Sequence, residues 1–186
     1  MRRAVFLDRD GVLTRSDVRD GKPYAPRRLE DFELLPGVAE TARALQAAGW
    51  LLIVVTNQPD LATGQLAPET LDAMHARLRD WLPLDDIRTC RHVDADRCDC
   101  RKPKPGLLVA AAQQWGVELQ ASFMIGDRWR DVSAGKAAGC RTIFLECGYA
   151  EALRDAPDFV VKSLSEAGNL ILGRASAGER NGGNIL

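Results

Sequence analysis

Two carboxylates that directly follow a short apolar run are the first residues here whose types and spacing suggest chemistry. Asp8 and Asp10 come after the run 4–7, and Gly11 follows them. On an extended segment, side chains two residues apart point to the same side. One carboxylate can then attack a phosphorus atom while the other handles the proton of the leaving group. Taken alone, an Asp-x-Asp-Gly segment is equally typical of a simple turn.

Three more polar segments supply groups that phosphoryl transfer needs. Thr56 and Asn57 follow a second apolar run and can form hydrogen bonds with phosphate oxygens. Lys102 precedes a helix candidate and can balance the charge of nucleophile and phosphate. Asp127 follows another apolar run and would help to hold Mg²⁺, which prefers oxygen ligands. Each segment alone is more typical of a turn, a helix cap or a solvated lysine. Their joint occurrence, in this order, indicates one site.

A second cluster consists of soft ligands. Cys90, His92, Cys98 and Cys100 lie within eleven residues. Three thiolates and one imidazole suit a tetrahedral Zn²⁺ in a closed, structural site. The alternative is three buried cysteines and a surface histidine. The intervening segment 93–97 is polar and offers those cysteines no apolar surroundings, so the pattern favours zinc.

The cysteine content also bears on the compartment. The chain has five cysteines, and crowding of three of them between residues 90 and 100 favours metal binding in a reducing, cytoplasmic setting over disulfides. Cys140 and Cys147 flank a strand candidate, and we expect them to be ordinary buried thiols.

The elements that must position these residues alternate along the chain. Apolar runs that suit strands buried on both faces lie at 4–7, 51–55, 122–125, 142–145 and 159–161. Helix candidates lie between them at 37–48, 68–81, 105–115, 131–138 and 164–172, with Gly49, Gly116 and Gly139 as C-terminal caps. This repetition predicts an α/β fold with a single, doubly wound, Rossmann-like parallel sheet flanked by helices. Ligands bind beyond the carboxyl ends of such strands, so the polar segments should meet at one edge.

Length and charge narrow the class of protein. A chain of 186 residues fits one domain, which we place at 1–172, followed by a flexible tail at 173–186. The formal net charge of −1 gives no general attraction to nucleic acid or acidic membranes. No apolar run reaches the ~20 residues of a membrane span, and the N-terminus lacks a signal-peptide pattern. We expect a cytoplasmic monomer without nucleic-acid or membrane partners.

Taken together, the motifs resemble those of haloacid-dehalogenase-type (HAD) phosphatases. The matching segments are Asp8-x-Asp10-Gly11, Thr56, Lys102-Pro103-x-Pro105 and Gly126-Asp127-x-x-x-Asp131. The resemblance covers residues 4–172 and implies an aspartyl-phosphate on Asp8, with Asp10 as general acid and then general base. It places Mg²⁺ on Asp8, Asp10 and Asp127, with Asp131 orienting this shell. No long insertion follows the first two motifs, which is typical of the capless branch.

The zinc motif narrows the resemblance further. A Cys-x-His segment followed by Cys-x-Cys-Arg-Lys-Pro is similar to two phosphatase families, which act on heptose 1,7-bisphosphate and on histidinol phosphate. Arg101 and Arg128 could hold the second phosphate of a bisphosphate, which favours a phosphorylated heptose as substrate. Arg9, Asn57 and Gln58 complete the predicted substrate contacts.

The chain departs from the heptose family at several places. Thr63 stands where that family usually has arginine, Val12 replaces a usual threonine, and Arg128 often corresponds to lysine. The loop 14–24, which should touch the substrate, is longer here. These changes leave the reaction type intact and bear on the identity of the sugar. Histidinol phosphate therefore stays an alternative substrate. A non-catalytic metal-binding module is a further alternative, although every residue that the chemistry needs is present.

Overall fold

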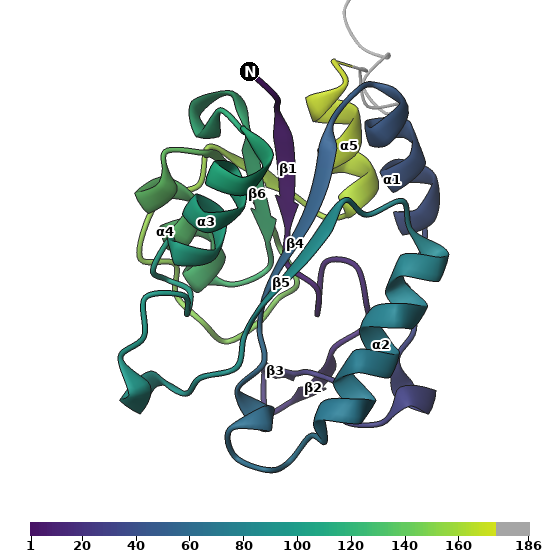
Figure 1. Cartoon of the computed structure of the whole chain (residues 1–186), viewed down its shortest axis with the longest axis vertical. Coiled ribbons are helices and arrows are strands. Elements are labelled where there is room, and N and C mark those ends of the chain that lie inside the picture. The colour runs from purple at the N-terminus through teal and green to yellow at the C-terminus, as the bar shows by residue number, and fades with distance from the viewer. Residues whose placement is uncertain (174–186) are drawn as a thin grey trace, which may run out of the picture.

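A computed structural model describes residues 1–173 of the chain and shows one six-stranded parallel sheet (Figure 1). The strand order is β5-β4-β1-β6-β7-β8. Their bounds are β1 Ala4–Leu7, β4 Leu51–Asn57, β5 Asp86–Cys90, β6 Phe123–Gly126, β7 Arg141–Leu145 and β8 Phe159–Val161. The predicted α/β class with a single parallel sheet is confirmed.

The centre of the sheet is apolar on both faces. In β1 all four residues are buried, and Phe6 lies opposite Ile53 of β4 and Met124 of β6. Such strands must be covered by helices on both sides, which explains the continuous apolar runs in the sequence. The carboxyl ends of β1, β4 and β6 therefore lie side by side.

Helices cover both faces of the sheet. They are α1 Val38–Ala47, α2 Pro68–Trp81, α3 Gly106–Trp115, α4 Trp129–Ala138 and α5 Leu164–Ile171. Figure 1 shows α3 and α4 on one side and α1, α2 and α5 on the other, in agreement with two separate hydrophobic clusters. Gly116 and Gly139 end α3 and α4 in the left-handed conformation, as predicted, and Gly49 lies one residue beyond the cap of α1. Short 3-10 helices span Leu29–Asp31, Pro59–Leu61, Asp94–Asp96 and Leu119–Ala121.

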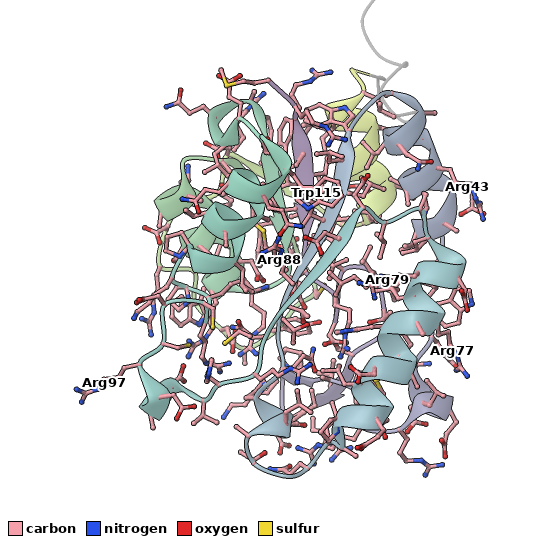
Figure 2. All side chains as sticks on the ribbon, viewed as in Figure 1. Arg43, Arg77, Arg79, Arg88, Arg97 and Trp115 are labelled. Carbon is pink, nitrogen blue, oxygen red and sulfur yellow. The ribbon has the colours of Figure 1, made fainter. Side chains whose placement is uncertain are left out.

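Strand β5 was missed by the apolar pattern because it is a half-buried edge strand with polar residues. Asp86 accepts hydrogen bonds from Trp115 Nε1 at 2.9 Å and from Arg88 Nε at 2.7 Å. Figure 2 shows Arg88 and Trp115 close together beside α3 and β5. The register places Cys90 opposite Asn57, so β5 delivers the first residue of the cysteine cluster to the carboxyl edge.

The long loop after Asp10 folds as an antiparallel hairpin, β2 Asp17–Arg19 and β3 Lys22–Tyr24. Its turn consists of Asp20 and Gly21, both with positive φ, as two-residue hairpin turns require. The strands are short and exposed, so no apolar alternation marks them in the sequence. The hairpin lies below the carboxyl edge of the sheet in Figure 1.

The two cysteines outside the cluster differ in burial. Cys140 is buried as expected, but Cys147 is exposed because it follows β7 in a surface loop. From residue 174 on, the predicted flexible tail lies outside the described residues. Among residues 1–173, no helix combines the length and the apolar character that crossing a membrane would take.

Candidate active site

The predicted polar segments meet at the carboxyl edge of the sheet, around a cavity of about 600 Å³. Ten of the residues singled out in the sequence line it: Asp8, Asp10, Thr56, Asn57, Gln58, Arg101, Lys102, Asp127, Arg128 and Asp131. The hairpin closes one side of the cavity with Lys22, Pro23 and Tyr24. Parallel strand ends therefore gather the candidate chemistry in one place.

A buried lysine links two of the carboxylates. Lys102 is 2% exposed, and its Nζ lies 2.8 Å from Asp8 Oδ1 and 2.5 Å from Asp131 Oδ1. Burial alone would lower the pKa of Lys102, but Asp131 and Asp8 raise it above its ordinary value. The ammonium group therefore stays charged and offsets part of the negative charge beneath the cavity.

The backbone of Lys102 is fixed by Asn57 at the end of β4. The Asn57 side chain accepts a hydrogen bond from the Lys102 N–H and donates one to its carbonyl oxygen, each at 3.1 Å. This two-way contact joins positions 45 residues apart. Asn57 was predicted to contact phosphate, and in the structure its amide is engaged in positioning the lysine.

Asp127 has the surroundings that a cation site would need. Neither oxygen of its buried carboxylate accepts a hydrogen bond of good geometry from a described residue, although the Tyr149 hydroxyl lies close to it. Burial first, and then the charges of Asp8 and Asp131, raise the pKa of Asp127 well above its ordinary value. Oxygens of these three carboxylates lie within 4.8 Å of one another. Such a donor set fits a hard divalent cation, which would bind the free oxygens and offset the repulsion.

Asp8 shares this environment. Burial raises the pKa of Asp8 to about 6, against the opposing charge of Lys102. Gly11 makes the close approach to Asp127 possible: its φ is +90°, and a Cβ atom there would lie 1.9 Å from Asp127 Oδ2. Any other residue at position 11 would displace the carboxylate.

Asp131 differs from the other two carboxylates because both its oxygens are engaged. Oδ1 accepts from Lys102, and Oδ2 accepts from the backbone N–H of Arg128 at 3.0 Å. Asp131 lies in the first turn of α4, and Gly126 gives it room, since a Cβ atom at 126 would lie 2.1 Å from Asp131 Cβ. These contacts are consistent with the orienting role expected from the sequence.

Asp10 is held by several donors. Gln58 Nε2 donates to Asp10 Oδ2 at 2.8 Å and to Thr56 Oγ1 at 2.9 Å. The Thr14 hydroxyl lies 3.2 Å from Asp10 Oδ1. Arg9 was predicted to bind substrate; in the structure its side chain is fully buried, does not line the cavity and contacts Asp10.

Several basic side chains line the cavity. Arg101 donates to Asp94 Oδ1 at 2.7 Å and to the carbonyl of His92 at 3.1 Å, and Arg128 pairs with Glu151. The sequence reasoning missed Arg130, which lies inside the Gly126–Asp131 motif and pairs with Asp94 at 3.0 Å. It also missed two cations of the hairpin region, Lys22 and Arg27.

Lys22 differs from these arginines in having no carboxylate partner in the described part of the chain, whereas Arg27 pairs with Asp60. No motif marks Lys22 in the sequence. Its position in the cavity depends on how the hairpin folds over the carboxyl edge.

Cys90 at the end of β5 forms a compact cluster with His92, Cys98 and Cys100 of the loop that leads to α3. Their ligand atoms are mutually close: Cys90 Sγ lies 3.7 Å from Cys98 Sγ and 3.3 Å from Cys100 Sγ, and His92 Nδ1 lies 3.3 Å from Cys100 Sγ. Zn–S bonds of about 2.3 Å in a tetrahedron place sulfur atoms about 3.8 Å apart. The donor set and the spacing can hold a metal ion, immediately before Arg101 and Lys102 in the chain.

Comparison with known proteins gives consistent matches. The family model described as HAD-hydrolase-like matches residues 99–167. A D-glycero-β-D-manno-heptose-1,7-bisphosphate 7-phosphatase of Rhodopseudomonas palustris is 39% identical, over 74% of this chain and 80% of its own. That of Pasteurella multocida is 31% identical over 95% and 100% of the two chains. The crystal structure of a D,D-heptose 1,7-bisphosphate phosphatase from B. bronchiseptica, complexed with magnesium and phosphate, has a TM-score of 0.80 and 28% identity, covering 92% of this chain and 98% of that one.

Proposed function

The chain belongs to the HAD-like hydrolases, among the heptose-1,7-bisphosphate 7-phosphatases, and from this membership we propose that Asp8 is its phosphoryl acceptor. The protein is a phosphatase, and its substrate in this proposal is D-glycero-D-manno-heptose 1,7-bisphosphate, which loses the 7-phosphate. One observation carries the assignment to this chain: Asp8 faces the cavity, held by the buried Lys102, with Asp10 and Asp127 beside it.

The reaction proceeds in two half-reactions. An oxygen of Asp8 attacks phosphorus, the bond from phosphorus to the sugar oxygen breaks, and Asp10 gives that oxygen its proton. Asp10 then takes a proton from water, the water oxygen attacks phosphorus, and the bond to Asp8 breaks. Inorganic phosphate leaves, and both carboxylates return to their starting states. Lys102 offsets the charge on Asp8 and phosphate throughout.

Mg²⁺ is the cofactor that this donor set favours. Asp8, Asp127 and the backbone carbonyl of Asp10 would hold it, and Asp131 would orient the lysine beside them. When bound, Mg²⁺ would offset the charge of the phosphate oxygens and of the carboxylates. The buried carboxylate of Asp127, which lies close to those of Asp8 and Asp131, supports this assignment.

Zn²⁺ is the second metal of the proposal. Cys90, His92, Cys98 and Cys100 would bind it with all four positions filled, so its role would be structural. The loop that it stiffens continues directly into Arg101 and Lys102. The metal would therefore help to hold the phosphate-facing lysine and the neighbouring arginine in place.

The cations that line the cavity favour a substrate with two phosphates. They are Arg101, Arg128, Arg130 and Lys22, and the first three already have a carboxylate partner. Lys22 is thus the cation best placed to receive a second phosphate. Histidinol phosphate instead carries an amine, which these cations would disfavour.

The test is a comparison of kcat/KM for heptose 1,7-bisphosphate, offered as each anomer, with that for histidinol phosphate. We expect the bisphosphate to be favoured by a factor of about ten to a hundred, and Arg101→Ala to reduce that advantage. Equal or faster turnover of histidinol phosphate would replace the heptose assignment. Absence of turnover of any phosphate ester, including 4-nitrophenyl phosphate with Mg²⁺, would support a non-catalytic module.

The proposal also covers the cellular compartment and the oligomeric state. The free cysteines and the crowded cluster suit a reducing compartment, and we assign the protein to the cytoplasm as a monomer that acts on a small phosphorylated sugar. Gel filtration with light scattering would measure its oligomeric state.

A further inference from the structure

Arg9 is a fully buried cation whose contacts are all inside the protein. Its Nε donates to Asp10 Oδ1 at 2.9 Å, and its Nη2 donates to Asp10 Oδ2 at 2.8 Å. This is a two-pronged contact between a planar guanidinium and a planar carboxylate, so it fixes the plane of the Asp10 side chain as well as its position. Asp10, with 12% of its side chain exposed, still reaches the cavity.

Arg9 is itself held from two other elements. Its Nη1 lies 3.2 Å from Nε2 of His75, which belongs to α2. Its guanidinium lies 5.2 Å from the ring centre of Phe32, which stacks on Trp81 with ring centres 5.8 Å apart. The contact with His75 spans 66 positions in the sequence. The Arg9 guanidinium that contacts Asp10 is therefore held in place by His75 of α2 and by Phe32, which packs on Trp81 of the same helix.

The histidine can serve as an acceptor for Arg9. It is 8% exposed, and burial first, followed by the charges of Arg9 and Arg79, lowers the pKa of His75 to about 4. The ring is therefore neutral near neutral pH and has one nitrogen without a proton. Nε2 can use that lone pair for the N–H of Arg9, which orients the arginine without placing a second positive charge against it.

We propose that Arg9 and His75 are positioning residues that align the Asp10 carboxylate for proton transfer to the leaving oxygen and from water. This inference rests on the proposed phosphatase activity. Proton transfer in a transition state demands precise placement, and an aspartate side chain with two rotatable bonds does not supply it alone. Gln58 and Thr14 each contribute one contact, whereas Arg9 contributes a rigid pair.

A purely structural role would predict a different outcome. A buried ion pair is weak evidence for stability, since well-packed apolar residues of similar volume often stabilise a protein as much. If Arg9 only filled space, its loss would damage turnover of every substrate to the same degree. If it aligns Asp10, damage should be greatest where the leaving group most needs a proton.

Leaving-group dependence separates these possibilities. We would measure kcat/KM, which covers the steps through transfer to Asp8, for Arg9→Lys and Arg9→Met. On heptose 1,7-bisphosphate, whose alkoxide leaves poorly, we expect a fall of about tenfold to a hundredfold. On 4-nitrophenyl phosphate, whose phenolate leaves without a proton, we expect a change within about threefold. Arg9→Lys keeps the positive charge but cannot form the pair of hydrogen bonds to Asp10, so its kcat/KM on the bisphosphate should fall as well.

The same variants should slow the second half-reaction, because water still needs Asp10 as a base. With 4-nitrophenyl phosphate, we expect a burst of about one nitrophenolate per active site, followed by slow turnover. Misfolding would lower the burst amplitude instead. Thermal unfolding of each variant measures that loss independently.

His75 allows a milder test that keeps Arg9. His75→Leu removes the acceptor and should lower kcat/KM on the bisphosphate by about threefold to tenfold, with little effect on 4-nitrophenyl phosphate. His75→Gln keeps an acceptor oxygen and should restore most of that loss. Arg43→Ala, on the outer side of α1 and away from the site (Figure 2), is the matched arginine control.

The outcomes distinguish the positioning role of Arg9 and His75 from the phosphatase activity itself. Equal losses on both phosphates in the Arg9 variants, without a burst, overturn the positioning role while the phosphatase assignment stands. If kcat/KM of His75→Gln on the bisphosphate is no higher than that of His75→Leu, His75 has no part in the positioning role. A wild-type protein that hydrolyses neither phosphate overturns the proposed function and this inference with it.

Discussion

Lys102 Nζ lies 2.8 Å from Oδ1 of Asp8, 94 positions away in the sequence, and the lysine is almost completely buried. Polar contacts, not apolar packing, hold the end of this side chain. It is held there by its contacts with two carboxylates and by the amide of Asn57, which binds its backbone. This ion pair links Asp8, the residue after β1, to the loop that carries the cysteine cluster.

Replacing this lysine should therefore affect both activity and stability. In Lys102→Met we expect turnover to fall by more than about a hundredfold, because the charge of Asp8 and phosphate is no longer offset. The free energy of unfolding should fall by about 3 kcal/mol, since buried carboxylates lose their partner. Phosphatase assays and urea unfolding measure the two effects. Lys104→Met, on the same loop with an exposed lysine, is the control and should change neither.

Asp127→Asn should separate magnesium binding from folding. The substitution removes a buried carboxyl group whose ionisation is opposed by burial and by the charges of Asp8 and Asp131, so the variant should unfold at a higher temperature than the wild type in the absence of Mg²⁺. Added Mg²⁺ should raise the unfolding temperature of the wild type but not of the variant. An equal rise in both proteins would contradict the assignment of Asp127 as a ligand.

The cysteine cluster predicts a bound metal that can be counted. Elemental analysis of protein purified without added metal should find about one zinc per chain. Cys100→Ser should lose the zinc, unfold at a lower temperature and turn over more slowly, because the loop before Lys102 loosens. Cys147→Ser, which changes an exposed thiol outside the cluster, should keep the zinc. Zinc retained in full by Cys100→Ser would exclude this site.

Lys22 should matter only for substrates with a second phosphate. In Lys22→Ala we expect KM for the bisphosphate to rise about tenfold, the equivalent of ~1.4 kcal/mol, through loss of one charge-assisted contact. KM for 4-nitrophenyl phosphate should stay unchanged. Arg19→Ala is the control on the same hairpin, since Arg19 pairs with Asp17 and does not line the active-site cavity. Equal effects on both substrates would point to a collapsed hairpin instead.

Acid should destabilise the protein through His75. Its pKa is lowered from 6.5 to about 4 in the folded chain, mainly by burial. Between those values the unfolded chain binds a proton that the folded chain does not, so the free energy of unfolding falls as the pH falls through this window. The contribution is on the order of 2 kcal/mol.

Urea unfolding of the wild type and of His75→Gln tests this sign. The variant cannot take up the proton, so it should lose less stability than the wild type between about pH 7 and about pH 4.5. Parallel losses in the two proteins would show that other groups cause the acid sensitivity.

The pattern of apolar and polar residues in the sequence was sufficient to predict the fold class and to identify most residues of the candidate site. The run at β1 is apolar on both faces because the strand is buried on both faces, so it predicted a central strand and a site at its end. Asp8, Asp10 and Asp127 follow strand ends, where parallel topology brings them together. The cluster of three cysteines and one histidine could be predicted without any long-range contact, because its four members lie within eleven residues of the sequence.

Tertiary structure alone decided the direction and partners of individual side chains. Arg9 turns inward because Asp10, His75 and Phe32 surround it, and two of these three are distant in sequence. Asn57 contacts the backbone of Lys102 instead of facing the cavity alone. Strand β5 and the hairpin with Lys22 have no apolar pattern because β5 is a half-buried edge strand and the strands of the hairpin are mostly exposed. Such features depend on many contacts between residues that are distant in the sequence, and a short stretch of neighbouring residues does not reveal these contacts.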